Sequence, residues 1–164
     1  MKAQEHLPIY GVGPYYGIGV IVTALAGLVL SATGVLSAGA LHSRPAALCF
    51  AAAGCLLLLL GGCVWAPAAL GRHAIDHYIQ ADRLCTTGVY RFVRNPCYSG
   101  IMLFCTGLLL LARNLLLLPL PPLYWLAMTV LMKHTEEKWL AERYGEAYRQ
   151  YCKRVNRCLP WIPK

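Results

Sequence analysis

The stretch that decides the fold is AALCFAAAGCLLLLLGGCVWAP, residues 46–67, in which no side chain carries a charge. It is as long as the ~20 apolar residues that an α-helix needs to cross a bilayer. Three further uncharged stretches occur at residues 6–43, 95–112 and 114–132. Four such stretches in one chain exclude a soluble globule, a disordered tail and a secreted disulfide scaffold. We therefore predict an all-α fold, an integral membrane bundle of about four transmembrane helices.

The predicted bundle is a single membrane domain over residues 1–164, and its four spans differ in length. The spans cover about residues 15–41, 46–67, 98–112 and 115–132. The third is short, because residues 98–112 reach only about 22 Å at 1.5 Å per residue. That span must tilt, thin the bilayer or borrow residues from the loop before it. In the fourth span, Pro119, Pro121 and Pro122 predict a broken or kinked first turn.

The sorting of charges predicts the orientation of the bundle. Charged residues make up 13% of the chain, with 15 Lys and Arg against 7 Asp and Glu. Alternating loops place Arg44 and Arg113 on one side of the membrane and all other charges on the opposite side. The thirteen cations of that opposite side are Lys2, Arg72, Arg83, Arg91, Arg94, Lys133, Lys138, Arg143, Arg149, Lys153, Arg154, Arg157 and Lys164. Because Lys and Arg concentrate on the cytoplasmic side, both termini and the long loop at residues 72–97 are predicted to be cytoplasmic.

The net charge of +8 and the eight cysteines each allow more than one interpretation. Contact with anionic membrane lipids explains the positive charge better than nucleic-acid binding, because no RNA-binding or helix-turn-helix motif accompanies it. No C-x-x-C pair occurs and four cysteines lie in apolar spans, so no metal site is predicted. The segment Gly11-Val12-Gly13 is not a nucleotide-binding loop, because no strand precedes it and no third glycine follows in register.

A C-terminal amphipathic helix is predicted over residues 135–156, on the cytoplasmic side. Thr135 is its expected N-cap, and Glu136 and Glu137 stand in the first turn, where acids oppose the helix dipole. The apolar positions recur at three- and four-residue steps, at Leu140, Tyr144, Tyr148, Tyr151 and Val155. Gly145 interrupts the pattern and marks a bend or a close backbone contact. A helix lying on the membrane also fits, but leaves the two acids without a role.

The block DHYIQADRLCTTGVYRFVRNPCYSG, residues 76–100, mixes polar side chains with turn formers at the mouth of the third span. Thr87-Gly88 signals a turn, and Asn95-Pro96 forces residue 95 away from the α region. Irregular backbone at such depth is tolerated where it is buried or lines a cavity. From these residues alone, both a structural loop and a cofactor-sized pocket remain open.

Two motifs in this half of the chain resemble a known family. They are T-T-G-V-Y-x-x-x-R-N-P-x-Y-x-G at residues 86–100 and E-E-x-x-L-x-x-x-Y-G-x-x-Y-x-x-Y at residues 136–151. This pattern is similar to the isoprenylcysteine carboxyl methyltransferase family and to related membrane phospholipid and thiol methyltransferases. The similarity covers about residues 76–160 and includes the ending KRVNRCLPWI. It implies S-adenosyl-L-methionine bound at the cytoplasmic membrane edge, and a lipidic or prenylated substrate that enters from the bilayer.

The resemblance also implies which residues form the site. Carried over by position, the cofactor contacts are Gln80, Asp82, Arg83, Leu84, Cys85, Tyr90, Asn95, Pro96, Tyr98 and Glu136, although the loop before Asp82 is shorter than in the family. Arg94 and Lys133 are the candidate substrate contacts. No catalytic residue is assigned, but Arg94 is a candidate for orienting an anionic group, and His77 for a general base if the nucleophile is an amine or thiol. Arg94 is equally consistent with a phosphate-contacting or helix-capping arginine.

Two departures from the family pattern affect the expected substrate. Asn95 stands where the eukaryotic prenylcysteine enzymes have histidine, and their carboxylate-binding arginine falls at Met132 here. Cofactor use is therefore better supported than methylation of a prenylcysteine carboxylate, although the latter is the activity that the pattern most resembles. The alternatives are an NADPH-dependent membrane sterol or ene reductase, a phospholipid N-methyltransferase, a thiol S-methyltransferase and a non-enzymatic membrane adaptor.

Overall fold

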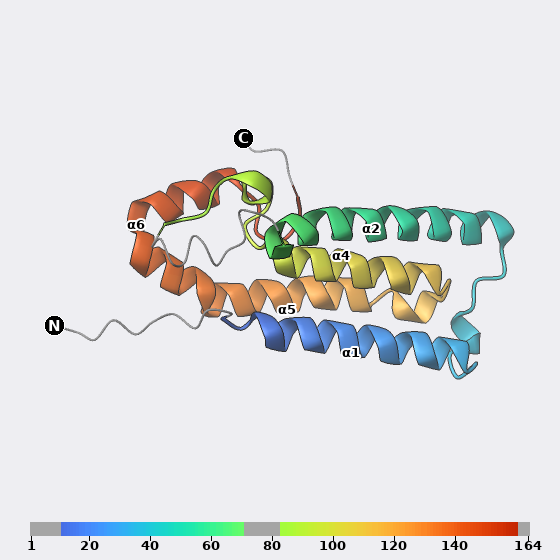
Figure 1. Ribbon diagram of the computed structural model, residues 1–164. Helices are drawn as coiled ribbons and strands as arrows, with labels where there is room; N and C mark the ends of the chain where they lie inside the picture. Colours follow the sequence, from blue (N-terminus) through green and yellow to red (C-terminus); the bar gives the residue numbers. More distant parts are fainter. Residues whose placement is uncertain (1–10, 71–82, 161–164) are drawn as a thin grey trace.

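A computed structural model describes residues 11–70 and 83–160, and within these ranges the chain forms five α-helices and no β-strand (Figure 1). The α-helices are α1 (Gly13–Ala32), α2 (Arg44–Leu70), α4 (Pro96–Leu111), α5 (Leu120–His134) and α6 (Glu136–Arg154). Three short 3₁₀ segments join them, η1 (Ser37–Gly39), η2 (Gly88–Arg91) and η3 (Leu115–Leu117). The prediction of an all-helical fold is confirmed for the described residues.

Within residues 11–70 and 83–160, three segments are long and apolar enough to cross a membrane. They are α1, α2 and the run Leu115–His134, which joins η3 to α5. The predicted third span corresponds to α4, which is apolar but has only 16 residues and a length of about 24 Å. Instead of four helices of spanning length, the described residues thus contain three and one shorter apolar helix.

The short helix α4 lies at the centre of the bundle, where it contacts α1, α2 and α5 (Figure 1). Its closest neighbour is α2, because two glycine pairs face each other across the contact: Gly54 opposite Gly107 and Gly61 opposite Gly100. A Cβ on Gly107 would lie 2.7 Å from the carbonyl oxygen of Gly54, and one on Gly61 would lie 2.7 Å from the backbone nitrogen of Phe104. Small residues at a helix contact allow this close approach in membrane bundles.

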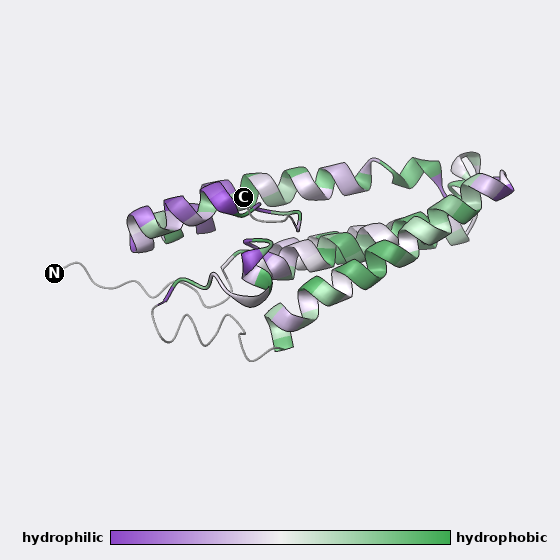
Figure 2. Cartoon of the chain, turned by 90° about the horizontal axis from the view of Figure 1, so that it is seen from above, coloured by the Kyte–Doolittle hydropathy of each residue, from purple (hydrophilic) through white to green (hydrophobic). Residues whose placement is uncertain are grey.

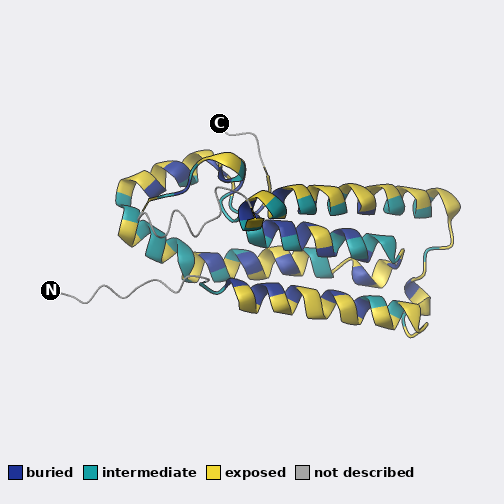
Figure 3. Ribbon diagram, viewed as in Figure 1, coloured by how far each residue is buried: buried dark blue, intermediate teal, exposed yellow. Residues whose placement is uncertain are grey.

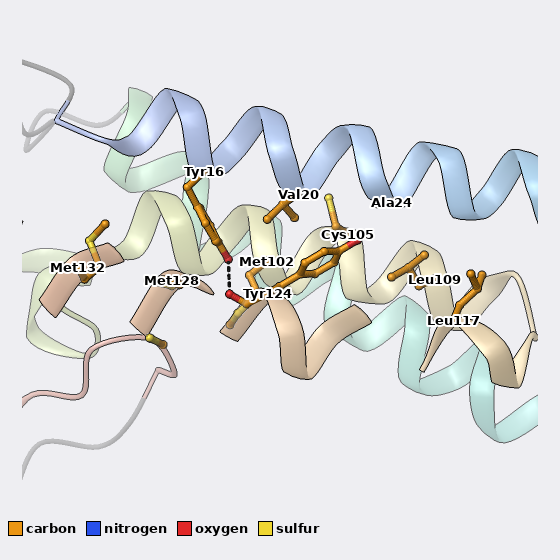
Figure 4. Close-up of a cluster of buried hydrophobic side chains, with 11 residues drawn as sticks. Tyr16, Val20, Ala24, Met102, Cys105, Leu109, Leu117, Tyr124, Met128 and Met132 are labelled. Carbon is orange, nitrogen blue, oxygen red and sulfur yellow. Dashed lines mark hydrogen bonds between the residues drawn. The ribbon is translucent and has the colours of Figure 1, made fainter. Parts of the chain in front are cut away.

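The buried core joins α1, α4 and α5 (Figure 4). Its members are Tyr16, Val20, Ala24, Met102, Cys105, Leu109, Leu117, Tyr124, Met128, Met132 and Cys158. The Tyr16 hydroxyl donates a hydrogen bond to the backbone carbonyl of Tyr124 at 3.2 Å, which satisfies the one polar group that Tyr16 brings into the core. In contrast, the outward faces of the helices are apolar and exposed (Figure 3), as expected of surfaces that contact lipid.

The first helix ends at Ala32, before the predicted limit of the first span at residue 41. The helix ends before Gly34, whose φ of +80° is the left-handed conformation that commonly terminates helices. A buried side chain from the distant hairpin binds this turn. The Asn114 amide donates to the Ser31 hydroxyl at 3.1 Å and to the Leu36 carbonyl at 2.9 Å. This contact fixes the turn between α4 and α5 against the end of α1.

The start of the fourth predicted span is broken, as the prolines indicated. The chain forms η3, and α5 begins only at Leu120, directly after Pro119. Proline lacks the N–H that would continue the helical hydrogen bonds from η3. The apolar run therefore crosses the bundle in two pieces.

Charged residues gather at the α6 end of the bundle (Figure 2). Every acid within the described residues lies on α6, at Glu136, Glu137, Glu142 and Glu146. Arg44 at the start of α2 and Arg113 after α4 lie at the opposite end. The charge sorting inferred from the sequence thus corresponds to two ends of one bundle.

Candidate functional site at the polar end

The corner between α5 and α6 carries two consecutive carboxylates into the site. Thr135 separates the two helices, but its hydroxyl donates to the Leu131 carbonyl at 2.6 Å instead of capping α6. The predicted N-cap position is therefore right and the predicted side-chain cap is wrong, because the threonine binds back into α5. Glu136 and Glu137 follow in the first turn of α6, where the helix dipole favours negative charge.

Tyr98 and Glu136 form a hydrogen-bonded pair between the two sequence motifs. The Tyr98 hydroxyl donates to Oε1 of Glu136 at 2.7 Å. The backbone N–H of Val12 donates to the same oxygen at 3.2 Å. Three segments that are distant in sequence, the starts of α1, α4 and α6, thus meet at one carboxylate.

The glycines of Gly11-Val12-Gly13 allow the start of α1 to approach Glu136 and Tyr98 closely. Gly11 has φ +49°, and a Cβ there would collide with Oε1 of Glu136. A Cβ on Gly13 would collide with the Tyr98 hydroxyl. Sequence analysis did not assign these residues to the site, because a close backbone approach from a distant segment leaves no local signal beyond the glycines themselves.

Burial raises the pKa of the Glu136 carboxyl above its ordinary value of 4.5, and the hydrogen bonds from Tyr98 and Val12 oppose the rise. Desolvation disfavours the charged form of a carboxyl group, and a nearby cation favours it. A positively charged ligand beside Glu136 would therefore interact favourably with it.

A second cluster centres on the neighbouring Glu137. Arg157 binds this carboxylate with two parallel hydrogen bonds, Nε to Oε1 at 2.6 Å and Nη2 to Oε2 at 2.8 Å. Arg94 adds an ion pair from Nη2 to Oε1 at 3.2 Å, and its Nη1 donates to the sulfur of Cys152. The hydrogen bond with Glu137 raises the pKa of Arg157. Glu137 and Arg157 were not predicted as site residues, although the acid pair and the ending KRVNRCLPWI contain them.

The backbone of the R-N-P motif is held by the segment that follows α6. The Arg94 N–H donates to the Asn156 carbonyl at 2.9 Å. The side-chain amide of Asn95 donates to the Arg157 carbonyl at 3.2 Å. Asn95, which the resemblance implies as a cofactor contact, directly precedes α4. Its side chain is hydrogen-bonded to the segment that follows α6.

The segment before α4 covers the apolar face of α6. Leu84 packs against Tyr148, Tyr151 and Val155, and the Tyr151 hydroxyl donates to the Tyr90 carbonyl at 2.6 Å. The predicted apolar face of α6 is confirmed, and Leu84 from the segment before α4 packs against it. The predicted bend is confirmed as well, at Gly145 with φ +54°, while nothing lies close enough to this glycine to indicate a tight contact.

The predicted site residues are distributed unevenly around this end. Tyr98 and Glu136 are hydrogen-bonded to each other, Asn95 directly precedes α4, and Pro96 is its first residue. Cys85 and Tyr90 are buried, and Arg83 and Lys133 are exposed. His77, Gln80 and Asp82 lie outside the described residues. No group of three His, Cys, Asp or Glu side chains is arranged for a metal ion in the part of the chain that the structure describes.

Met132 has a side chain that is 0% exposed and belongs to the core. By the resemblance noted in the sequence, it stands where the carboxylate-binding arginine of the prenylcysteine enzymes is expected. Its burial means that this position contacts hydrophobic neighbours in the present chain.

A family comparison covers most of these elements. Residues 49–147 match the phospholipid methyltransferase family, a range that includes both Tyr98 and Glu136. The chain belongs to the phospholipid methyltransferase family. Membership of this methyltransferase family agrees with an apolar bundle whose two sequence motifs meet at its polar end.

Relatives of this phospholipid methyltransferase family member carry methyltransferase names. It is 34% identical over 95 residues to protein-S-isoprenylcysteine O-methyltransferase of Schizosaccharomyces pombe, covering 55% of this chain and 40% of the relative. It is 31% identical over 93 residues to probable protein-S-isoprenylcysteine O-methyltransferase of Oryza sativa subsp. indica, covering 52% and 45%. It is 32% identical over 90 residues to methanethiol S-methyltransferase 1 of Bradyrhizobium diazoefficiens, covering 54% and 30%. The matched region spans less than half the length of each relative, and no solved structure matches the chain significantly.

Proposed function

We propose that this chain is an S-adenosyl-L-methionine-dependent membrane methyltransferase that acts on a lipidic or prenylated acceptor. The observation that carries the proposal is the 2.7 Å hydrogen bond between Tyr98 and Glu136, because it joins the two family motifs at one point. This point lies at the polar end of an otherwise apolar bundle (Figure 2). The methyltransferase names of the relatives support the same activity.

The residues at this end fit the cofactor. Glu136 is a carboxylate whose charged form is penalised by burial, so a cationic ligand beside it is favoured. When bound, S-adenosyl-L-methionine supplies an electrophilic methyl group on a cationic sulfonium. In this proposal Glu136, Tyr98 and Asn95 hold the cofactor, together with the segment from Arg83 to Tyr90 and the predicted contacts outside the described residues.

The chain's own contribution to catalysis is alignment and exclusion of water. A nucleophile held in line with the methyl group reacts without the entropy cost of bringing the two together. The first turns of α4 and α6 fix the cofactor residues, and the apolar bundle keeps water from the acceptor side. Arg94 and Lys133 stay candidates for orienting an anionic acceptor, and His77 for accepting a proton from an amine or thiol.

We further propose that α4 completes a four-helix membrane bundle and that the polar end is cytoplasmic. The described cations other than Arg44 and Arg113 lie on the elements of the polar end, and Lys and Arg concentrate on the cytoplasmic side of membrane proteins. In this orientation α6, both termini and the site face the cytoplasm.

The acceptor can be identified by methyl transfer. Purified protein is incubated with methyl-labelled S-adenosyl-L-methionine and, in separate reactions, a prenylcysteine analogue, membrane phospholipids and small thiols. We expect label in the prenylcysteine analogue as a base-labile ester. Label in the thiols alone would favour the second candidate, a thiol S-methyltransferase, which the relative from Bradyrhizobium diazoefficiens supports. Absence of label in every reaction, with active relatives as positive controls, would contradict methyltransferase activity.

A further inference from the structure

The start of α1 lies beside the carboxylate of Glu136, at the end of the bundle where α5 meets α6 (Figure 1). The backbone N–H of Val12 donates to Oε1 of Glu136 at 3.2 Å across 124 positions of the chain. Val12 lies outside residues 49–147, the range that matches the family. The contact is therefore a feature of this chain that the family comparison does not assign.

Two donors converge on the same oxygen of this carboxylate. The Tyr98 hydroxyl reaches Oε1 of Glu136 at 2.7 Å from α4, and the Val12 N–H reaches it from α1. A carboxylate offers about four acceptor positions, two on each oxygen. Tyr98 and Val12 thus saturate Oε1, and Oε2 is the oxygen that is left for a ligand.

The backbone of residues 11–13 closes the space around Oε1. A Cβ on Gly11 would collide with Oε1 of Glu136, and a Cβ on Gly13 would collide with the Tyr98 hydroxyl. This packing leaves no room for a ligand atom between Oε1 and the start of α1.

Tyr16 fixes this part of α1 in place. Its backbone N–H donates to the Val12 carbonyl at 3.2 Å. Its ring meets the Tyr98 ring edge-on, with the ring centroids 5.9 Å apart. Its hydroxyl donates to the Tyr124 carbonyl of α5 at 3.2 Å (Figure 4). The first turn of α1 is attached to both α4 and α5, so the Val12 N–H has a defined position relative to Glu136.

We propose that Val12 is a positioning residue of the candidate cofactor site, whose N–H holds Oε1 of Glu136 together with Tyr98 and leaves Oε2 to the ligand. A carboxylate that is already fixed loses little side-chain freedom on binding, so less of the interaction energy is spent on ordering it. The inference rests on the proposed function in one respect, that the ligand is S-adenosyl-L-methionine. A backbone N–H at the start of α1 then controls affinity at a site on α4 and α6.

The hydrogen bond can be followed by nuclear magnetic resonance of the full chain in an uncharged detergent, without any cofactor. The chain carries isotope-labelled valine, and the Val12 amide signal is identified by its loss in Val12→Ala. Between pH 4.5 and about 8 we expect this signal to move as Glu136 becomes charged, and to stay fixed in Glu136→Gln. The Val20 signal is the control, because Val20 is buried in the core on the same helix. A Val12 signal that ignores pH, or that moves equally in Glu136→Gln, would overturn the proposal.

The other ionisable groups around Glu136 can be separated from this titration. Tyr98 faces it from α4 as a phenol, whose ordinary pKa of about 10 lies above the range used. Glu137, the next residue on α6, is held by two arginines. Lys133 and His134 stand at the exposed end of α5. The Glu136→Gln variant retains all of these groups, so a movement that it abolishes belongs to Glu136.

Removing the N–H tests its effect on binding. Val12→Pro deletes this donor with a small change in backbone conformation, because Val12 has φ −89° and proline prefers about −65°. Burial raises the pKa of the Glu136 carboxyl and the Val12 hydrogen bond opposes the rise, so loss of the bond should raise that pKa further. In calorimetric titrations, the pH midpoint of S-adenosyl-L-methionine binding should move upward, and the affinity at neutral pH should fall by about threefold to tenfold. Val12→Ala keeps the N–H and is the matched control, which should change neither quantity.

A folded Val12→Pro variant with the wild-type midpoint and affinity would overturn the proposal, as would equal effects of Val12→Pro and Val12→Ala. Should Val12→Pro fail to give a cooperative melting curve, the Val12 signal of the wild-type chain decides. Absence of S-adenosyl-L-methionine binding, with a Val12 signal that follows Glu136, would overturn the proposed function and leave the positioning of Glu136. Binding in a chain whose Val12 signal ignores Glu136 would overturn the positioning role and leave the function.

Discussion

Glu136 and Glu137 are neighbours in the chain and serve different clusters. Successive residues of an α-helix point about 100° apart, so one carboxylate meets Tyr98 and the other meets Arg157. The difference in partners gives them different electrostatics. Glu136 is partly buried beside a neutral phenol, and Glu137 is neutralised by two arginines.

Replacing Tyr98 by Phe removes the hydroxyl that holds Glu136 and keeps the ring. We expect Tyr98→Phe to weaken binding of S-adenosylhomocysteine by about threefold to tenfold, because one hydrogen bond to a charged group is lost. Titration calorimetry of the purified protein measures this. Tyr15→Phe is the matched control, since Tyr15 is 81% exposed. Unchanged affinity in Tyr98→Phe would remove Tyr98 from the site.

The raised pKa of Glu136 predicts how cofactor affinity depends on pH. As the pH rises from the ordinary value of 4.5 through the raised pKa, the carboxyl becomes charged in the folded protein. Affinity for the cationic S-adenosyl-L-methionine should then increase, by at most about tenfold per pH unit, and level off above the raised pKa. Glu136→Gln should flatten this profile, measured by calorimetry between pH 4.5 and 8. A wild-type profile that falls with pH contradicts the role of Glu136.

Stability of the ligand-free protein should change in the opposite direction. In the same pH window the folded state binds more protons than the unfolded state, because burial raises the pKa of Glu136 only in the fold. The free energy of unfolding contributed by this group therefore decreases as pH rises. Cofactor binding should offset that loss.

Gly11 is predicted to be intolerant of a side chain. Gly11→Ala adds a Cβ against Glu136 at a backbone φ of +49°, which alanine rarely adopts. We expect a loss of about 1 kcal/mol or more in the free energy of unfolding, with weaker S-adenosylhomocysteine binding. Gly19→Ala is the control, because nothing lies near a Cβ there and alanine favours helix α1. Equal melting temperatures for the two variants would show that the N-terminal segment does not press on Glu136.

At the scale of elements, the contact between α2 and α4 positions the site, because α4 carries Tyr98 in its first turn and directly follows Asn95. The glycine pairs bring the two backbones together over the length of this contact. Displacement of α4 would move the whole R-N-P motif.

Gly61→Leu should therefore destabilise the bundle strongly. Its side chain would meet the backbone of α4, where overpacking costs about 1–3 kcal/mol or more. Gly62→Leu is the matched control on the neighbouring residue, where nothing lies within contact distance of a Cβ. Thermal melting followed by circular dichroism in detergent distinguishes them. A Gly61→Leu variant as stable as Gly62→Leu contradicts the close α2–α4 contact.

Sequence alone was sufficient for features that depend on local pattern. The break before α5 follows from three prolines, and the bend at Gly145 and the apolar face of α6 follow from periodicity. The end of α1 at Ala32 was missed because the apolar run continues to residue 41, although Gly34, which adopts φ +80° after the helix, is the local signal that could have indicated it.

The site was predictable where a motif marked it and not where distant segments supplied it. Tyr98 and Glu136 each belong to a motif, and the structure places them in contact. The bonds from Val12 to Glu136 and from Arg157 to Glu137 join residues 124 and 20 positions apart in the chain, so no local pattern indicates them. Such partners become visible only when the fold is known.

Across the whole molecule, an apolar bundle ends in one polar cap that contains the described acids (Figure 2). This arrangement suits a reaction between a water-soluble cofactor and an acceptor that resides in lipid. A non-enzymatic membrane adaptor with the same helices would not need the Glu136 carboxylate that Tyr98 and the start of α1 hold. Substitution of Glu136 or Tyr98 would then leave its function intact.

Calorimetric titration of the purified chain with S-adenosylhomocysteine and, separately, with NADPH tests the central claim most directly. We predict that S-adenosylhomocysteine binds, that NADPH does not, and that Glu136→Ala weakens the binding by about tenfold or more while the variant stays folded. Binding of NADPH without S-adenosylhomocysteine would instead indicate a membrane reductase. Equal S-adenosylhomocysteine affinity in the wild type and Glu136→Ala would contradict the site.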